Sequence, residues 1–186
     1  MFKPIISSAI SQHNEVIKKI NVDEIEVVVE VLIDAIKNGS SILWCGNGGS
    51  ASQANHLSAE LIGGMHKEKK MPYKSISLCT DTTFLTAWSN DDSFDNIFAR
   101  QIQSLSQPGD ILIGLTTSGN STNLINAFKL ANQRGVITVS LTGNNGGKLK
   151  QLSKLNVNVD DSCTQRIQEM HILIGHILCN LIELKA

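Results

Sequence analysis

Two ionisable side chains lie one helical turn apart behind a glycine-rich turn. The stretch CGNGGSASQANHLSAEL, residues 45–61, runs from that turn into a predicted helix that carries His56 and Glu60. Residues at positions i and i+4 share one helix face, so the imidazole and the carboxylate could ligate one divalent ion or act as an acid–base pair. The same spacing is also typical of an ordinary surface pair, and the spacing alone leaves these alternatives open.

A second group of polar residues lies on the helix predicted at residues 164–184. Its members are Gln168, Glu169, His171 and His176. Gln168 and His176 are eight residues apart, which is about 12 Å along a helix axis, so both could only just reach an ion midway between them. The two histidines on this apolar helix are equally typical of packing residues or interface contacts.

The loop TTSGNST, residues 116–122, indicates an anion site at the start of a helix. It places Thr116, Thr117, Ser118 and Ser121 around Gly119, where free backbone N–H groups and the helix dipole favour a phosphate. The loop has no lysine, which argues against a nucleoside triphosphate, and CGNGGS departs from the dinucleotide-binding pattern. A sugar phosphate is the favoured ligand, and the plainer alternative is a capped helix N-terminus.

The elements that must position these residues alternate between strands and helices. This pattern predicts a doubly wound α/β fold with a mainly parallel five-stranded sheet, in which both glycine-containing loops lie at the carboxyl ends of strands. Two N-terminal helices are expected within 5–37, the second capped by Asp23. Strands are expected at 41–45, 75–78, 111–115 and 136–141, and an edge strand is expected at 155–159. Helices are expected at 50–63, 81–87, 95–104 and 164–184. Another helix should follow the loop TTSGNSTN and end at 131, and a short helix should follow the glycines at 146–147.

Composition narrows the class of protein. The 186 residues are 41% apolar with a net charge of −1, which predicts one domain over 1–186 and no nucleic-acid-binding face. We expect no membrane span and no signal peptide, because the chain has no apolar run of the required ~18 residues and no basic–apolar leader. The four cysteines are widely spaced, which is typical of free thiols in a reducing compartment, so we expect a cytoplasmic protein.

The chain resembles the sugar-isomerase (SIS) domain family and, within it, the phosphoheptose isomerases. The resemblance runs nearly end to end, and its most specific part is the combination of NGGS-x5-HxxxE with RIQExHxxxxH. The phosphate loop is shared by all SIS domains. The matching stretches are residues 45–61, SNDDSFDNIFARQI at 89–102, PGDILIGLTTSGNSTNLINA at 108–127, LTGNNGGKL at 141–149 and TQRIQEMHILIGHILCNLIE at 164–183.

The resemblance implies a role for each matching residue. The phosphate would be held by Thr116, Thr117, Ser118 and Ser121. The sugar would be contacted by Asn47, Gly48, Gly49, Ser50, Asn90 and Asp91, and also by Glu60 and Gln168. One zinc ion per subunit would be bound by His56, Glu60, Gln168 and His176. Glu60 would be the catalytic base and His176 the acid.

The implied reaction is an aldose–ketose isomerisation of sedoheptulose 7-phosphate to D-glycero-D-manno-heptose 7-phosphate, for the heptose of lipopolysaccharide core or capsule. Such a reaction passes through an enediol and needs a base, an acid and stabilisation of negative charge. The resemblance also implies a homotetramer with active sites at subunit interfaces, and we expect the helices within 1–37 to serve in its assembly. Two departures are small: Thr116 replaces a common serine, and Gln165, which replaces an aspartate of some enzymes, is assigned no role.

A non-enzymatic relative offers a different function. Some SIS tetramers bind the bacterial replication initiator protein, and they share the pattern seen here as TDTTFLTAWSND and RIQEMH. In that group the equivalents of Glu60 and His176 are replaced, whereas this chain keeps both, which favours the enzyme. Sugar-phosphate-sensing SIS modules normally accompany a DNA-binding domain, for which 186 residues leave no room.

Overall fold

The computed structural model describes residues 1–66 and 71–186, and within these ranges five strands form one all-parallel sheet. The strand order is β2-β1-β3-β4-β5, so the predicted edge strand β5 does lie at an edge. The strands are β1 (Ile42–Gly46), β2 (Ser75–Ser77), β3 (Ile111–Thr116), β4 (Ile137–Gly143) and β5 (Leu155–Val159). The predicted doubly wound α/β class is confirmed.

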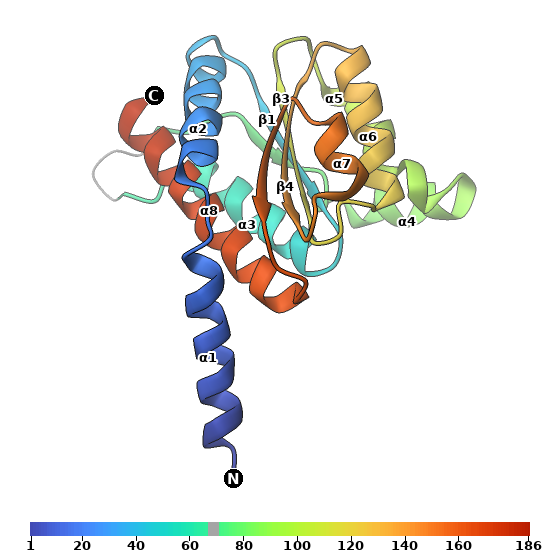
Figure 1. Cartoon of the computed structure of the whole chain (residues 1–186). Coiled ribbons are helices and arrows are strands. Elements are labelled where there is room, and N and C mark those ends of the chain that lie inside the picture. Colours follow the sequence, from blue (N-terminus) through green and yellow to red (C-terminus); the bar gives the residue numbers. More distant parts are fainter. Residues whose placement is uncertain (67–70) are drawn as a thin grey trace.

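Helices cover both faces of the sheet, and Figure 1 shows α2, α3 and α8 on one side with α5, α6 and α7 on the other. The helices are α1 (Lys3–Ile17), α2 (Val22–Lys37), α3 (Gly49–Gly63), α4 (Thr82–Asp91), α5 (Ile97–Leu105), α6 (Thr122–Gln133), α7 (Gly147–Leu152) and α8 (Thr164–Lys185), with a 3-10 turn at Phe94–Asn96. Among the described residues, no helix is both long and apolar enough to cross a membrane.

Each face of the sheet carries its own apolar core. In β1, Ile42 and Trp44 pack with α2, α3 and α8, whereas Leu43 and Cys45 pack with α5, α6 and α7. All five residues of β1 are buried, as expected for a central parallel strand covered on both faces. Because β1 pairs with β3 in parallel, the carboxyl ends of these two strands lie side by side. The two glycine-containing loops begin at these ends.

The first helix stands apart from this arrangement. Figure 1 shows α1 extending well beyond the layered body, and Val16 is its one buried residue. Ile5, Ile6 and Ile10 are more than half exposed. An apolar surface of this kind on a protruding helix is typical of an interaction site.

Several predicted helix ends are wrong by a few residues. The N-cap of α2 is Asn21 and not Asp23: the Asn21 side chain accepts hydrogen bonds from the Asp23 and Glu24 N–H groups. Asp23 instead lies in the first turn, where its charge favours the helix dipole. The helix predicted at 81–87 continues to Asp91, and the one predicted at 95–104 begins as a 3-10 turn, because Ser93 caps that turn by accepting from the Asp95 N–H.

One buried histidine gives the fold a pH dependence. His171 on α8 is fully buried, and its Nε2–H donates to the carbonyl of Thr142 at the end of β4 over 3.1 Å. Burial lowers the pKa of His171 to about 4, against the opposing effect of that hydrogen bond. The native imidazole is therefore neutral at pH values where the unfolded chain is already protonated.

We expect the free energy of unfolding to fall as the pH drops from 6.5 toward 4, because only the unfolded state then binds the extra proton. Between pH 7.5 and 5 the wild type should lose about 2 kcal/mol more than His171→Gln, which cannot titrate in this range. Urea unfolding at matched chain concentration measures the difference. Equal losses in the two proteins would contradict the assignment.

Candidate active site

A pocket of about 230 Å³ opens where the loops after β1 and β3 meet the start of α8. Seven of the residues predicted to bind substrate line it, joined by Leu115 and Thr164, which sequence reasoning missed. Thr164 is the first residue of α8 and is separated from the RIQE motif by Gln165 alone, so its position close to a recognised motif was the available signal. The seven predicted residues are Asn47, Ser50, Thr116, Thr117, Ser118, Ser121 and Gln168.

The hydroxyl-rich loop after β3 is shaped for an anion. Ser121 is the N-cap residue of α6, yet its side chain makes no capping hydrogen bond. The capped-terminus alternative therefore does not account for this serine. Gly119 adopts φ +66°, and a Cβ there would lie 2.0 Å from the carbonyl oxygen of Gly146, so only glycine fits. The loop at 146–147 thus packs directly against the predicted phosphate loop.

The glycine turn after β1 brings α3 against the start of α8. A Cβ on Gly49 would lie 2.7 Å from Nε2 of Gln168, so the missing side chain makes room for this amide. The Gln53 side chain donates to the backbone carbonyl of Gln168 over 2.6 Å, which ties the same two helices together. Gly48 precedes α3 with φ +55°, a conformation that favours glycine.

Asn90 and Asp91 lie outside this pocket. They end α4, which Figure 1 shows projecting away from the sheet. Both are exposed, and the Asn90 amide donates to the Asp91 carboxylate over 2.9 Å. The chain therefore does not bring them to its own pocket, although sequence reasoning assigned them to the sugar.

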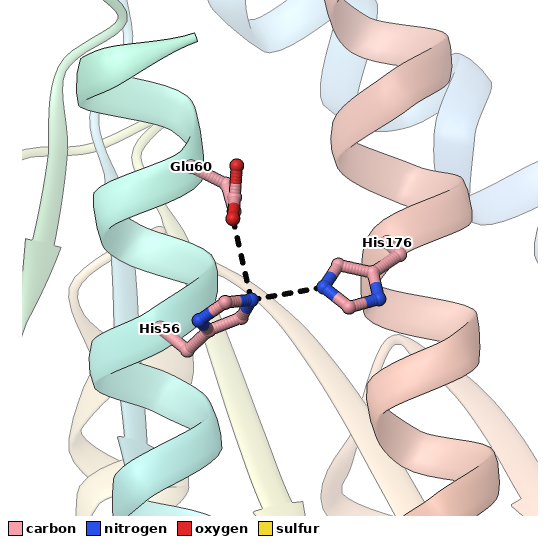
Figure 2. A group of neighbouring side chains, drawn as sticks. All are labelled: His56, Glu60 and His176. Atoms are coloured by element: carbon pink, nitrogen blue, oxygen red, sulfur yellow. Dashed lines mark hydrogen bonds and ion pairs between the residues drawn. The ribbon is translucent and has the colours of Figure 1, made fainter. Parts of the chain in front are cut away.

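His56 and Glu60, both on α3, meet His176 of α8. Figure 2 shows His56 between Glu60 and His176. The His56 Nε2 atom lies 2.9 Å from His176 Nε2 and 3.3 Å from Glu60 Oε1. Two ring nitrogens at this distance share one proton in a hydrogen bond, so one ring presents a lone pair to the other. The surface-pair interpretation is incomplete, because it leaves out the third residue.

These three residues form a donor set suited to a divalent cation. Their ligand atoms all lie within 4.8 Å of one another. Two imidazoles and a carboxylate are a known protein ligand set of catalytic zinc sites, which keep a further position for water or substrate. His56 is about half exposed and Glu60 about one-quarter exposed, so solvent and ions can reach the group.

The close approach of α3 and α8 depends on a glycine that sequence reasoning overlooked. A Cβ on Gly175 would lie 2.3 Å from Cδ1 of Leu57, and Leu57 is fully buried. Gly175 directly precedes His176, and Leu57 directly follows His56, so the contact lies next to the histidine pair. The available signal was a glycine in a helix interior, where it costs about 1 kcal/mol relative to alanine.

A thiol lies beneath this group but takes no part in it. Burial, reinforced by the negative charges of Glu60 and Glu183, raises the pKa of Cys179 to about 12. Its thiol faces the Leu57 carbonyl, with 3.7 Å between Sγ and the oxygen. Cys179 therefore stays protonated, and all four cysteines are free, as predicted.

The all-parallel sheet and the phosphate-type loop that lines a pocket at the end of β3 define a protein of the SIS-domain class. The SIS domain family model matches residues 7–143. Phosphoheptose isomerase of Aliarcobacter butzleri is 45% identical over 92% of each chain, and that of Helicobacter pylori strain P12 is 45% identical over 98% of this chain and 96% of its own. A phosphoheptose isomerase structure from Neisseria gonorrhoeae superposes with a TM-score of 0.92 at 37% identity, covering 98% of each chain.

The chain belongs to the phosphoheptose isomerases of the SIS-domain family. The enzyme class expected from the sequence is thereby confirmed as an isomerase that interconverts an aldose and a ketose.

Gly175→Ala should destabilise the protein by about 1–3 kcal/mol, because the added methyl overlaps the buried Leu57 side chain. It should also lower isomerase activity, since separating α3 from α8 moves His56 away from His176. The matched control is Gly63→Ala, near the end of α3, where a Cβ would meet nothing within 4 Å. Thermal unfolding and activity assays of both variants check this, and equal behaviour would contradict the packing argument.

Proposed function

We propose that this protein converts sedoheptulose 7-phosphate to D-glycero-D-manno-heptose 7-phosphate by proton transfer through an enediol. The observation that carries the proposal is the meeting of Glu60, His56 and His176 on α3 and α8, the two helices whose starts also line the hydroxyl-rich pocket through Ser50 and Gln168. The similarity of this chain to proteins named phosphoheptose isomerase supports the same reaction.

The proposed binding mode places the phosphate in the pocket and the sugar along α3 and α8. The hydroxyls and backbone N–H groups of Thr116, Thr117, Ser118 and Ser121 bind the phosphate. Gln168 lines the pocket, and His176 lies eight residues further along α8, about 12 Å along the axis. This separation supports a long sugar phosphate, whose phosphate and reacting carbons lie at opposite ends. The sugar would be contacted by Asn47, Gly48, Gly49, Ser50, Glu60 and Gln168.

In this proposal Glu60 is the base and His176 the acid. The carboxylate takes a proton from C1 of the ketose, and the resulting enediol accepts a proton at C2 to give the aldose. His176 exchanges protons with the oxygens on C1 and C2, so the isomerisation is balanced and redox-neutral. Figure 2 shows one oxygen of Glu60 facing His56 and the other pointing away, which leaves an oxygen for the substrate.

We infer that one zinc ion per subunit is held by His56, Glu60 and His176. The resemblance implies Gln168 as a fourth ligand, and its amide lies beside Gly49 at the starts of α3 and α8. The donor set on the first three residues supports this assignment. When bound, zinc would polarise the substrate oxygens and stabilise negative charge on the enediolate. A carboxylate bound to the ion would be a weaker base, so the ligand and base roles proposed for Glu60 oppose each other.

We propose a homotetramer with active sites at subunit interfaces. The exposed isoleucines of α1 support assembly through the N-terminal helices within 1–37. An apolar hollow of about 660 Å³ between α2 and α8, lined among others by Ile25, Val29 and Ile177, supports it further. Asn90 and Asp91, which lie outside their own chain's pocket, would then contact the sugar in a partner's site.

The enzyme would act in the cytoplasm, and its product would supply heptose for lipopolysaccharide core or capsule. Binding of the replication initiator has less support, since Glu60 and His176 are both present and brought to one point by the fold. The net charge of −1 gives no reason to add a nucleic acid to the expected partners.

The direct test incubates the purified chain with sedoheptulose 7-phosphate and measures formation of the aldoheptose 7-phosphate. We expect turnover by the wild type and at least a hundredfold lower kcat for Glu60→Gln, because the amide cannot accept the proton. Sedimentation velocity should give the same tetramer for both. Near-full activity of Glu60→Gln would refute the base assignment, and no turnover by the wild type would refute the reaction.

Zinc content is predicted separately. Elemental analysis of the purified protein should give about one zinc per chain, and His56→Ala should lose most of it because one of three clustered donors is removed. His66→Ala is the matched control, since His66 is an exposed histidine bonded to Asn180 outside the cluster. A fully active, metal-free wild type would show that these residues are polar site lining only.

A further inference from the structure

Two asparagines join the glycine turn after β1 to the helix behind the phosphate loop. The Asn47 side chain donates to Oδ1 of Asn123 over 2.9 Å, and the Asn123 side chain donates back to Oδ1 of Asn47 over 2.9 Å. Asn47 lines the pocket, whereas Asn123 is only 2% exposed and lies in the first turn of α6. This reciprocal pair, here called the amide pair, connects positions 76 residues apart.

The backbone of α6 determines which way both amides face. The Leu124 N–H donates to Oδ1 of Asn123 over 3.0 Å, and a backbone N–H can only donate. This contact identifies the oxygen of the Asn123 side chain, and the reciprocal bonds then identify the oxygen and nitrogen of Asn47. Rotating either amide by 180° would place two donors or two acceptors against each other, at the cost of unsatisfied buried groups.

The amide pair leaves Asn47 with spare hydrogen-bonding capacity that faces the pocket. An amide carries two N–H donors and two lone pairs on its oxygen, and the pair uses one of each. One N–H and one lone pair remain on Asn47, on the wall of the pocket that also contains Thr116 and Ser121. Asn123 is not among the lining residues, so it can act on a ligand only through Asn47.

We propose that Asn123 is a positioning residue for substrate specificity. It holds the Asn47 amide in one orientation toward the hydroxyls of a phosphorylated sugar, and it sets the separation between the sugar-contacting turn and the phosphate loop. Without Asn123, the Asn47 side chain is free to rotate, and contacts to the sugar weaken. The phosphate loop keeps its own hydroxyls and N–H groups, so contacts to phosphate remain. The inference rests on the proposed function for the identity of the sugar phosphate.

The test compares two ligands on the full chain by titration calorimetry: sedoheptulose 7-phosphate and inorganic phosphate. Asn123→Ala should bind the sugar phosphate roughly tenfold more weakly, as expected for losing a paired set of hydrogen bonds, and inorganic phosphate within about twofold of wild type. Asn123→Ser provides a second variant of similar polarity in case alanine impairs folding. Asn126→Ala is the matched control: it removes an amide from the same helix that bonds to Asp95 and Asn96 instead.

A double-mutant cycle separates positioning from a merely structural role. Because Asn123 acts through Asn47, the double variant Asn47→Ala with Asn123→Ala should bind the sugar phosphate no more weakly than Asn47→Ala alone. The inference would be overturned if the two substitutions weakened sugar phosphate binding independently, so that their fold-changes multiplied in the double variant. It would also be overturned if Asn123→Ala lost as much affinity for inorganic phosphate as for the sugar phosphate. A wild type that binds the sugar phosphate without isomerising it would refute the proposed function alone, because these binding comparisons need no turnover.

Discussion

The close packing of α3 against α8 is the contact on which the site depends. At the crossing, Gly175 leaves space for the buried Leu57 side chain, and the two neighbouring histidines come to 2.9 Å between their Nε2 atoms. The same helices meet again at their starts, where Gly49 makes room for the Gln168 amide. At both of these points a glycine lets polar groups from the two helices meet. A larger residue at either point would separate the groups that carry the chemistry.

The sheet supplies the second half of the arrangement. Because β1 and β3 are parallel neighbours, the loops that follow them end at the same edge, and one pocket can use both. Their relative position is then refined by contacts that are not part of the sheet. The amide pair of Asn47 and Asn123 ties the first loop to α6, and the turn at Gly146 supports the second loop. Polar bonds between buried or half-buried groups suit this purpose, since they have a defined direction as well as a defined length.

Charge is distributed in keeping with these roles. His171 is buried and neutral beneath the end of β4, and Cys179 is buried and held as a thiol. By contrast, the side chains of His56 and Glu60 are partly exposed, so substrate and ions can reach them. The three histidines on α3 and α8 thus differ in function because of their depth. From the sequence, His56 could be a site residue or part of a surface pair, and His171 and His176 could be site residues, packing residues or interface contacts.

The sequence by itself determined the α/β class, the approximate elements, the two loops at strand ends and the family, because periodicity and loop composition are local properties. It also named the residues that line the pocket, with the exception of Leu115 and Thr164. It misplaced the cap of α2, since Asn21 and Asp23 are both good caps and only the backbone at Asn21 distinguishes them. Only the tertiary structure decided that His56 and His176, 120 residues apart, share a hydrogen bond, and that Asn90 and Asp91 lie outside the pocket. The physical reason is that these relations depend on how closely helices pack, and that is decided by contacts such as Gly175 with Leu57 that no local pattern encodes.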